Sequence, residues 1–333
     1  MKIFISGIAG FLGSHLADAF LEKGHTVSGC DNLSGGYREN VPDNVYWEVA
    51  DLCDFPTMLR LTEGVDVVYH CAATAYEGLS VFSPYHVTQN IVGASVSLVT
   101  ASIQNRVKRF VYCSSMARYG TNITPFTEDM PPNPQDPYGI GKVAGEKILQ
   151  NLAEVHGMSY VIAVPHNIIG PRQKYDDPYR NVASIMINRM LQGEQPIIYG
   201  DGNQKRCFSY IQDDVDILSQ FALRQDINGE IFNIGPDEEF VTINELADII
   251  ADIIKFPLKP IYVPGRPQEV KLANCSADKI RKVFGYQTKY SLYEGVQEMV
   301  KYIQKRGTKP FQYHIALEIE NERTPVTWTK KMF

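Results

Sequence analysis

Three glycines between a predicted strand and a predicted helix constrain this chain most strongly. The segment GIAGFLG at residues 7–13 follows the short apolar run 2–6 and opens a helical stripe of apolar residues that ends at Gly24. Glycines at this spacing permit a tight turn, close approach of the backbone to phosphate, and close packing of helix on strand. The helix N-terminus adds free N–H groups and a positive dipole end. The segment therefore predicts a dinucleotide-binding turn with contacts from Gly7, Gly10, Phe11, Leu12 and Gly13.

Strand-like and helix-like runs alternate through the first half of the chain. The predicted strands after the first are 26–30, 45–49, 65–71 and 109–114, and the predicted helices are 11–23, 83–105 and 138–156. Several strands are apolar on both faces, which is typical of a parallel sheet covered by helices on both sides. The alternation predicts an α/β fold, a doubly wound parallel sheet of the Rossmann type.

The pattern loosens after about residue 165, where prolines and glycines become frequent. We expect residues 1–165 to form the main domain, with 207–235 returning to its sheet. Residues 166–206 and 236–306 are predicted to form a smaller C-terminal lobe. The tail 307–333 has no amphipathic period but is rich in aromatic residues, so we expect it to dock on a surface.

Composition excludes several classes of protein. The 333 residues carry 32 Lys and Arg against 38 Asp and Glu, so a basic nucleic-acid footprint is not expected. No apolar run is long enough to span a bilayer, and we expect no membrane partner. Six cysteines without a C-x-x-C pair or a His cluster indicate free thiols and no metal site. With no recognisable targeting segment, these features predict a cytoplasmic protein.

Asp31 stands at the end of the second predicted strand, eighteen residues after Gly13. A carboxylate there can accept hydrogen bonds from both ribose hydroxyls of an adenosine and would repel a 2′-phosphate, which favours NAD over NADP. Asp51 and Leu52 follow the third strand and would suit contact with the adenine edge. Asp51 has the alternative role of capping the next helix.

A tyrosine and a lysine four residues apart open the predicted helix 138–156. Tyr138 and Lys142 share one helix face, where an ammonium group stabilises a phenolate and lowers the tyrosine pKa. Such a tyrosine acts as a general acid or base near neutral pH. Ser114 and Ser115 end the strand before it, and a serine hydroxyl there could bind the same substrate oxygen. An isolated Y-x-x-x-K is usually a surface pair, but here it accompanies the dinucleotide turn.

Together these motifs resemble the extended short-chain dehydrogenases/reductases of the nucleotide-sugar epimerase/dehydratase family, most closely the UDP-glucose 4-epimerase group. The resemblance covers about residues 1–305. It is carried by GIAGFLG, Asp31-Asn32, HCAA at 70–73, SSMARYG at 114–120, Y-x-x-x-K, NIIGPRQ at 167–173, GDGNQKRCFSYIQDD at 200–214 and RPQEV at 266–270. It implies that the smaller lobe binds a nucleotide sugar, with a UDP-sugar favoured, and that the protein is a homodimer joined through helices near 83–105 and 138–156.

The resemblance also assigns roles to residues. Tyr138 would be the acid/base, Lys142 would hold the nicotinamide ribose, and Ser115 would bond the reacting sugar oxygen. Further cofactor contacts are implied for Asn32, Ala72, Ala73, Asn90, Ser114 and Pro165, and substrate contacts for Asn167, Arg206, Arg266 and Glu269. The two arginines have the alternative of being surface ion-pair residues. Tyr76 and Glu77 could contact sugar hydroxyls or an acetamido group, or could be plain loop residues.

The family supports several reactions, which begin with transient oxidation of the sugar to a keto-sugar. An epimerase returns the hydride to the opposite face. The dehydratases carry an Asp-Glu pair directly after the Ser/Thr, but this chain has Met116 and Ala117, which cannot transfer protons. The sequence therefore favours an epimerase over a dehydratase or dehydrogenase. A non-catalytic NAD-sensing protein is the remote alternative. His166 could line the sugar pocket or pack at a strand end.

Overall fold

A parallel sheet of seven strands organises the chain, described here from a computed structural model of residues 1–333. Its strands are β1 (Lys2–Ser6), β2 (Thr26–Asp31), β3 (Tyr46–Val49), β4 (Val67–His70), β5 (Arg109–Cys113), β6 (Ser159–Pro165) and β11 (Ile231–Ile234). Their spatial order is β11-β6-β5-β4-β1-β2-β3, and every neighbouring pair is parallel. The doubly wound Rossmann-type fold is confirmed. The strand order reverses between β1 and β4, where such sheets bind ligands outside their carboxyl ends.

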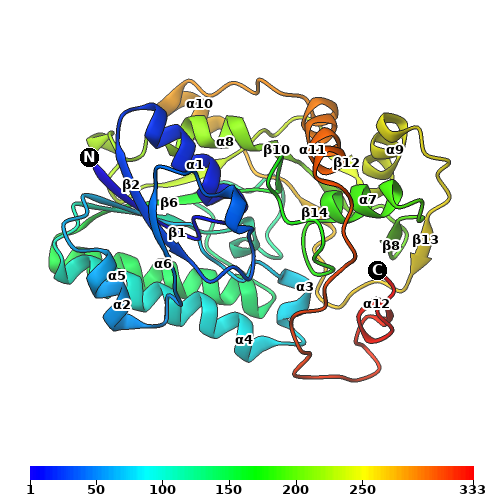
Figure 1. The fold of residues 1–333 in the computed structure, drawn as a ribbon, viewed down its shortest axis with the longest axis horizontal. Coiled ribbons are helices and arrows are strands. Elements are labelled where there is room, and N and C mark those ends of the chain that lie inside the picture. Colours follow the sequence, from blue (N-terminus) through cyan, green and yellow to red (C-terminus); the bar gives the residue numbers. More distant parts are fainter.

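Helices cover both faces of this sheet (Figure 1). One face carries α1 (Phe11–Glu22), α8 (Ile211–Leu218) and α10 (Asp278–Phe284), and the other carries α2 (Phe55–Leu61), α5 (Ala94–Gln104) and α6 (Pro137–His156). Phe20 of α1 and Leu218 of α8 are fully buried in the first core, and Leu98 of α5 and Leu149 of α6 in the second. Burial on both faces explains the almost continuous apolar runs of the strands.

The predicted helix 83–105 is present in three consecutive pieces. α4 (Pro84–Thr88) leads through a π-helical turn (Gln89–Gly93) into α5. A π-helical turn inserts one extra residue into the helical hydrogen-bond pattern and is frequently found at functional sites. Here the turn lies beside the carboxyl edge of the sheet, on the side where ligands are expected.

A smaller lobe lies beside the carboxyl ends of the sheet strands (Figure 1). Its core is formed by α7 (Val182–Leu191), α9 (Ile243–Ile254) and α11 (Leu292–Arg306). Its short strands are β7 (Ile168–Ile169) with β10 (Ser209–Tyr210), β8 (Ile197–Tyr199) with β13 (Ile261–Val263), and β9 (Lys205–Arg206) between β12 (Val241–Thr242) and β14 (Leu272–Ala273). Capping boxes begin α9 at Thr242 and α11 at Ser291, so these helices have defined starts.

The C-terminal tail runs from the lobe to the main domain and back, and it ends in the short helix α12 (Val326–Thr329) (Figure 1). Trp328 is 4% exposed and packs edge-on against Phe82 and Tyr179. The Glu318 carboxylate accepts hydrogen bonds from the first backbone N–H groups of α4, both at 2.8 Å. The tail is thus docked, as its aromatic content predicts. No helix of the structure is both long enough and apolar enough to cross a membrane.

Candidate active site

The turn between β1 and α1 has no space for side chains at its glycines. Gly7 has a φ of 73°, and a Cβ there would lie 2.9 Å from the backbone of Ala72. A Cβ on Gly13 would lie 2.2 Å from the carbonyl oxygen of Gly7. The turn therefore packs directly on the segment after β4 and presents backbone N–H groups at the start of α1, which is the geometry that a diphosphate-binding turn needs.

Asp31 ends β2 and braces this turn. Its Oδ2 accepts a hydrogen bond from the N–H of Ala9 at 3.0 Å, and its Oδ1 accepts one from the N–H of Leu33 at 2.7 Å. Burial raises the pKa of Asp31, and these backbone hydrogen bonds oppose that rise. Each carboxylate oxygen has two lone pairs, so Asp31 keeps acceptor capacity toward the cavity that it lines.

A cavity of about 200 Å³ lies outside the carboxyl ends of β1, β2 and β4. Its lining includes twelve of the residues predicted to contact the cofactor: Gly7, Gly10, Phe11, Leu12, Gly13, Asp31, Asn32, Asp51, Leu52, Ala72, Ala73 and Asn90. Asn90 reaches the cavity from the π-helical turn. The N-cap of α2 is Asp54, not Asp51, so the capping alternative does not hold. A tight glycine turn, a carboxylate at the end of β2 and an apolar floor fit a dinucleotide such as NAD.

Ser115 and Tyr138 meet beside this cavity from two different elements. Ser115 follows β5, and its Oγ accepts a hydrogen bond from the N–H of Ala117 at 3.1 Å. Tyr138 is in the first turn of α6, where Asp136 caps the helix by accepting a hydrogen bond from the N–H of Gly139 at 2.8 Å. Burial raises the pKa of Tyr138, and its contact with the Ser115 hydroxyl partly offsets this rise. The two hydroxyls therefore face one space and can bind one substrate oxygen.

Lys142 lies one turn further along α6 and is 3% exposed. Its Nζ donates a hydrogen bond to the carbonyl oxygen of Cys113 at 2.7 Å, and burial lowers its pKa to about 8. The sequence predicts that this lysine lowers the Tyr138 pKa. In the structure the pKa of Tyr138 lies above its ordinary value, because burial outweighs every favourable charge. The expected lowering is thus wrong for the protein without its ligands.

A buried ion pair supports the loop that holds Ser115. Arg118 and Glu146 are 3% and 1% exposed, and Arg118 Nε lies 3.1 Å from Glu146 Oε1. The Ser114 hydroxyl donates to the same carboxylate oxygen. Glu146 of α6 therefore holds the residues on both sides of Ser115 and fixes that serine relative to Tyr138.

A second cavity, of about 360 Å³, lies between the sheet and the smaller lobe. Eight predicted site residues line it: Ser114, Ser115, Tyr138, Pro165, Asn167, Arg206, Arg266 and Glu269. Lys142 is not among the lining residues of either cavity. Asn167 has a φ of 44° and donates from Nδ2 to the carbonyl oxygen of Cys207 at 2.8 Å. A strained non-glycine residue at a cavity wall is typical of functional sites.

Two arginines bring positive charge to this cavity. Arg266 Nη2 lies 2.7 Å from Glu269 Oε1, and its guanidinium packs 4.6 Å above the Tyr199 ring. Arg206 Nη2 donates to the carbonyl oxygen of Val270 at 2.6 Å. Both side chains lie at the cavity wall, and Arg266 also forms the ion pair that is the alternative interpretation of these arginines. Guanidinium groups in this arrangement suit a diphosphate.

The structure decides between the alternatives left open for Tyr76, Glu77 and His166. Tyr76 does not line the cavity, because its hydroxyl donates to buried Asp177 at 2.6 Å and its ring packs beneath the tail. The chain turns into α3 (Glu77–Ser80) at this point, so Glu77 lines the cavity instead. His166 is 1% exposed, bonds the carbonyl oxygen of Pro236 at 2.7 Å and packs at the end of β6. Burial lowers its pKa.

Among the lining residues that sequence reasoning missed, two are charged or aromatic side chains that bear on the site. Arg180 borders both cavities, and Phe333 borders the second. Neither belongs to a motif or a periodic segment. Arg180 ends a proline-containing loop, and Phe333 is the last residue of a tail without amphipathic period. Only the folded arrangement brings them to the site.

Residues 3–235 match the model of the NAD dependent epimerase/dehydratase family. The chain belongs to this family. A UDP-glucose 4-epimerase of Mycolicibacterium smegmatis from the curated proteins is 33% identical over 318 residues, which cover 92% of this chain and 100% of that protein. The family description names NAD as the cofactor, in agreement with Asp31 and the glycine turn.

Solved structures of family members have the same fold. The UDP-glucose 4-epimerase of Thermotoga maritima with UDP-glucose is 33% identical, with a TM-score of 0.85 and coverage of 92% of this chain and 99% of that chain. The UDP-glucuronic acid 4-epimerase of Bacillus cereus in complex with UDP-glucuronic acid and NAD is 26% identical, with a TM-score of 0.86 and coverage of 92% and 100%.

Proposed function

We propose that this family member is an NAD-dependent UDP-hexose 4-epimerase. The observation that carries the proposal is the position of Ser115 and Tyr138, whose hydroxyls face a cavity lined by Arg206 and Arg266 and adjoining the dinucleotide cavity. The similarity to the UDP-glucose 4-epimerases of M. smegmatis and T. maritima supports UDP and a hexose as the two parts of the substrate.

The residues have separate tasks in this reaction. When bound, NAD supplies an acceptor for the hydride of the sugar and gives the hydride back. Tyr138 takes the proton of the sugar hydroxyl and later returns it, while the Ser115 hydroxyl binds the same oxygen. Lys142 remains largely protonated near pH 7, since its pKa is about 8, and places a positive charge beside the site where the phenolate forms.

The diphosphate end of the substrate is held in place, whereas the sugar end can turn. Arg206 and Arg266 hold the diphosphate, and Asn167 supports it from the start of the lobe. The sugar ring then occupies the end of the cavity near Tyr138, where the keto-sugar can present either face to the returning hydride. Inversion at one carbon follows because the fixed diphosphate keeps the reacting carbon within reach.

The cavity chemistry favours epimerisation over elimination. Loss of water needs one group that protonates the leaving hydroxyl and another that removes a carbon-bound proton. Met116 and Ala117, which follow Ser115, have no titratable group, and both are 8% exposed. Of the carboxylates in the cavity lining, Glu269 is paired with Arg266 and only Glu77 is left.

Glu77 also supports a neutral hexose over a uronate. Its carboxylate lines the cavity that contains Ser115 and Tyr138, so a carboxylate at C6 of the sugar would add a second negative charge to the same space. We expect a preference for UDP-glucose over UDP-glucuronate in kcat/KM. Glu77→Gln should narrow that preference, and an unchanged ratio would contradict this role.

The experiment is incubation of the purified protein with UDP-glucose, UDP-galactose and their N-acetyl and uronate forms, without added reductant. Chromatography and NMR should reveal an isomer of equal mass inverted at C4. A product lighter by water would indicate a dehydratase, and stoichiometric NADH would indicate a dehydrogenase. Either result would contradict the proposal.

We further propose a cytoplasmic homodimer. Six cysteines are all free thiols, which supports a reducing compartment. The faces of α5 and α6 carry exposed apolar residues, with Val96 38% exposed, Ile140 53% and Val155 67%, and these support a four-helix interface. Analytical ultracentrifugation should give twice the mass of the 37.5 kDa chain, and a monomer at micromolar concentration would refute the dimer.

A further inference from the structure

Arg180 occupies the boundary between the two cavities. It stands directly before Asn181, whose side chain caps α7 by accepting a hydrogen bond from the N–H of Ala183 at 2.9 Å. On the cofactor side its guanidinium packs against Gly35, where a Cβ would lie 2.0 Å from Arg180 Nη2. On the other side it lines the same cavity as Tyr138. Arg180 thus contacts both ligand spaces, and Ala75 is the other residue that lines both.

The charge balance of the cofactor cavity depends on this arginine. The lining contains two carboxylates, Asp31 and Asp51, and Arg180 is its only basic residue. A dinucleotide would bring two more negative charges in its diphosphate. The N-terminus of α1 offers only a partial positive charge. Arg180 is therefore the only full positive charge in the lining that can balance the diphosphate.

The donors of Arg180 are available for a ligand. Its Nε lies 3.5 Å from Asp177 Oδ2, and its guanidinium packs 4.9 Å above the Tyr76 ring. These contacts hold one edge and one face of the group. Tyr76 and Asp177 stabilise the charge of Arg180, and its buried Nε has no hydrogen-bond partner. A guanidinium fixed in this way presents a fork of N–H groups that matches phosphate oxygens.

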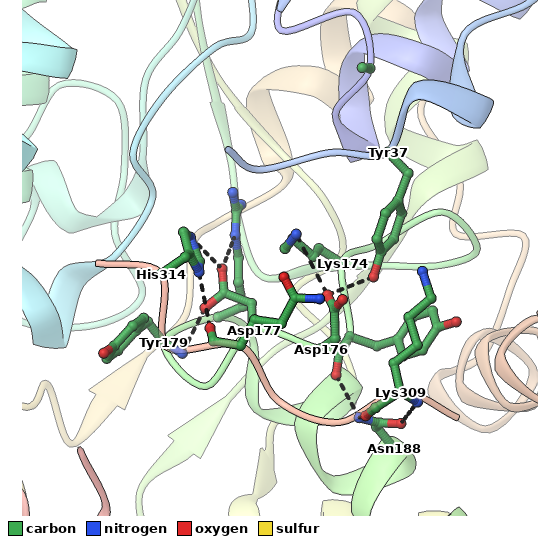
Figure 2. Close-up of polar contacts among 12 residues, drawn as sticks. Tyr37, Lys174, Asp176, Asp177, Tyr179, Asn188, Lys309 and His314 are labelled. Carbon is green, nitrogen blue, oxygen red and sulfur yellow. Dashed lines mark hydrogen bonds and ion pairs between the residues drawn. The ribbon is translucent and has the colours of Figure 1, made fainter. Parts of the chain in front are cut away.

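A buried network holds the arginine in place. Asp177 is fully buried and accepts hydrogen bonds from the Tyr76 hydroxyl at 2.6 Å and the N–H of Tyr179 at 3.0 Å. Figure 2 shows His314 of the tail beside the same carboxylate, 3.8 Å from its Oδ2. The next residue, Asp176, accepts a hydrogen bond from Tyr37 at 2.7 Å (Figure 2). The loop is therefore anchored to the main domain and to the tail.

We propose that Arg180 binds the diphosphate of NAD through its terminal guanidinium nitrogens, and that Tyr76 and Asp177 are positioning residues for it. The proposal rests on the NAD dependence in the proposed function but not on the sugar that is epimerised. Because Arg180 also forms the wall of the sugar cavity, a bound cofactor completes that wall. Cofactor binding thereby prepares the space for the substrate.

The test is isothermal titration of the protein freed of nucleotide with NAD, ADP-ribose, adenosine and UDP. Arg180→Met and Arg180→Gln should weaken the binding of NAD and of ADP-ribose about 30-fold, which is the loss of affinity expected when charge-assisted hydrogen bonds are removed. Adenosine lacks phosphate and UDP belongs to the other cavity, so both should change less than about 3-fold. Arg60→Met is the matched control, since Arg60 is 55% exposed on α2 and pairs only with Glu48. It should leave all four affinities unchanged.

Three results would overturn the proposal. NAD could bind both Arg180 variants as tightly as the unmutated protein. The variants could lose affinity for UDP while they keep affinity for NAD, which would assign Arg180 to the substrate diphosphate. The binding of adenosine could weaken as much as the binding of NAD, which would indicate a general distortion of the site. None of these results depends on epimerase activity, so a failure of the proposed function is seen separately.

The positioning role has its own readout. Tyr76→Phe removes the hydroxyl that bonds Asp177 and should weaken NAD about 4-fold in the unmutated background. In the Arg180→Met background the same change should have no effect, because the residue on which Tyr76 acts is gone. Equal losses of NAD affinity in the two backgrounds would contradict the positioning role.

Discussion

Replacement of Lys142 by methionine should stabilise the protein while it destroys catalysis. Lys142 is 3% exposed, and its pKa falls from an ordinary 10.5 to about 8 because burial penalises the charged form. A fall of this size (10.5 − 8) means that the buried charge costs about 3 kcal/mol at neutral pH. Methionine fills a similar volume without charge, but it leaves the Cys113 carbonyl oxygen unpaired at a cost of about 1.5 kcal/mol. We therefore expect a net gain of about 2 kcal/mol at pH 7.

The pH dependence makes this prediction specific. Below pH 8 the lysine is protonated in both the folded and the unfolded state, so its full cost is present. Between pH 8 and 10.5 the unfolded state binds more protons, and the stability of the unmutated protein rises relative to the variant. Urea unfolding of the nucleotide-free proteins at pH 7 and pH 9.5 measures the difference. A variant less stable at pH 7, or a difference independent of pH, would refute the reasoning.

Three further predictions follow from the site and the tail. Tyr138→Phe should lower kcat at least about 1,000-fold and leave NAD affinity unchanged in titration, because it removes only the proton-transferring hydroxyl; near-full activity would exclude Tyr138 as the acid/base. Asp31→Ala should weaken NAD and reduce discrimination against NADP, since the carboxylate that repels a 2′-phosphate is gone; equal affinities in the unmutated protein would contradict this. Trp328→Ala should speed limited proteolysis after Gly307, because a tryptophan 4% exposed anchors the tail at about 3 kcal/mol; an unchanged cleavage rate would show that other contacts hold it.

The elements with strong local patterns could be predicted from the sequence. The strand Lys2–Ser6 has three consecutive apolar residues at its centre and is followed by the glycine turn. This strand and the helix after the turn are present as expected. The predicted strand near 230–234 is β11, which pairs with β6 at the edge of the sheet. Most of the predicted cofactor and catalytic residues follow directly on a strand or open a helix. Short-range sequence context determines such positions.

The rest depends on contacts between segments far apart in the chain. Tyr76 and Glu77 are adjacent, and which of them faces the cavity is decided by Asp177, about a hundred residues later. Arg180 acquires its position from the ring of Tyr76 and from Asp177, a carboxylate that His314 of the tail also approaches. No local periodicity encodes such pairings, so sequence patterns alone could not rank Arg180 above other loop arginines.

The docking surface of the C-terminal tail also depends on contacts between distant segments. Its aromatic residues predict docking, but not the surface on which they dock. In the structure they complete a small apolar cluster with Tyr76, Leu79, Phe82 and Tyr179, and Phe333 reaches the substrate cavity. The relatives of M. smegmatis and T. maritima are covered almost in full by 92% of this chain. This border of the second cavity is therefore formed by the last residue of the chain.

The central claim is that hydride leaves C4 of the sugar and returns to the same carbon within one site. The most direct measurement is the reaction of UDP-[4-²H]glucose, followed by mass spectrometry and NMR of the product. The account predicts UDP-galactose of equal mass, with deuterium retained at C4 and no label released to solvent. Loss of the deuterium to solvent, its accumulation in free NADH, or a product lighter by water would contradict it.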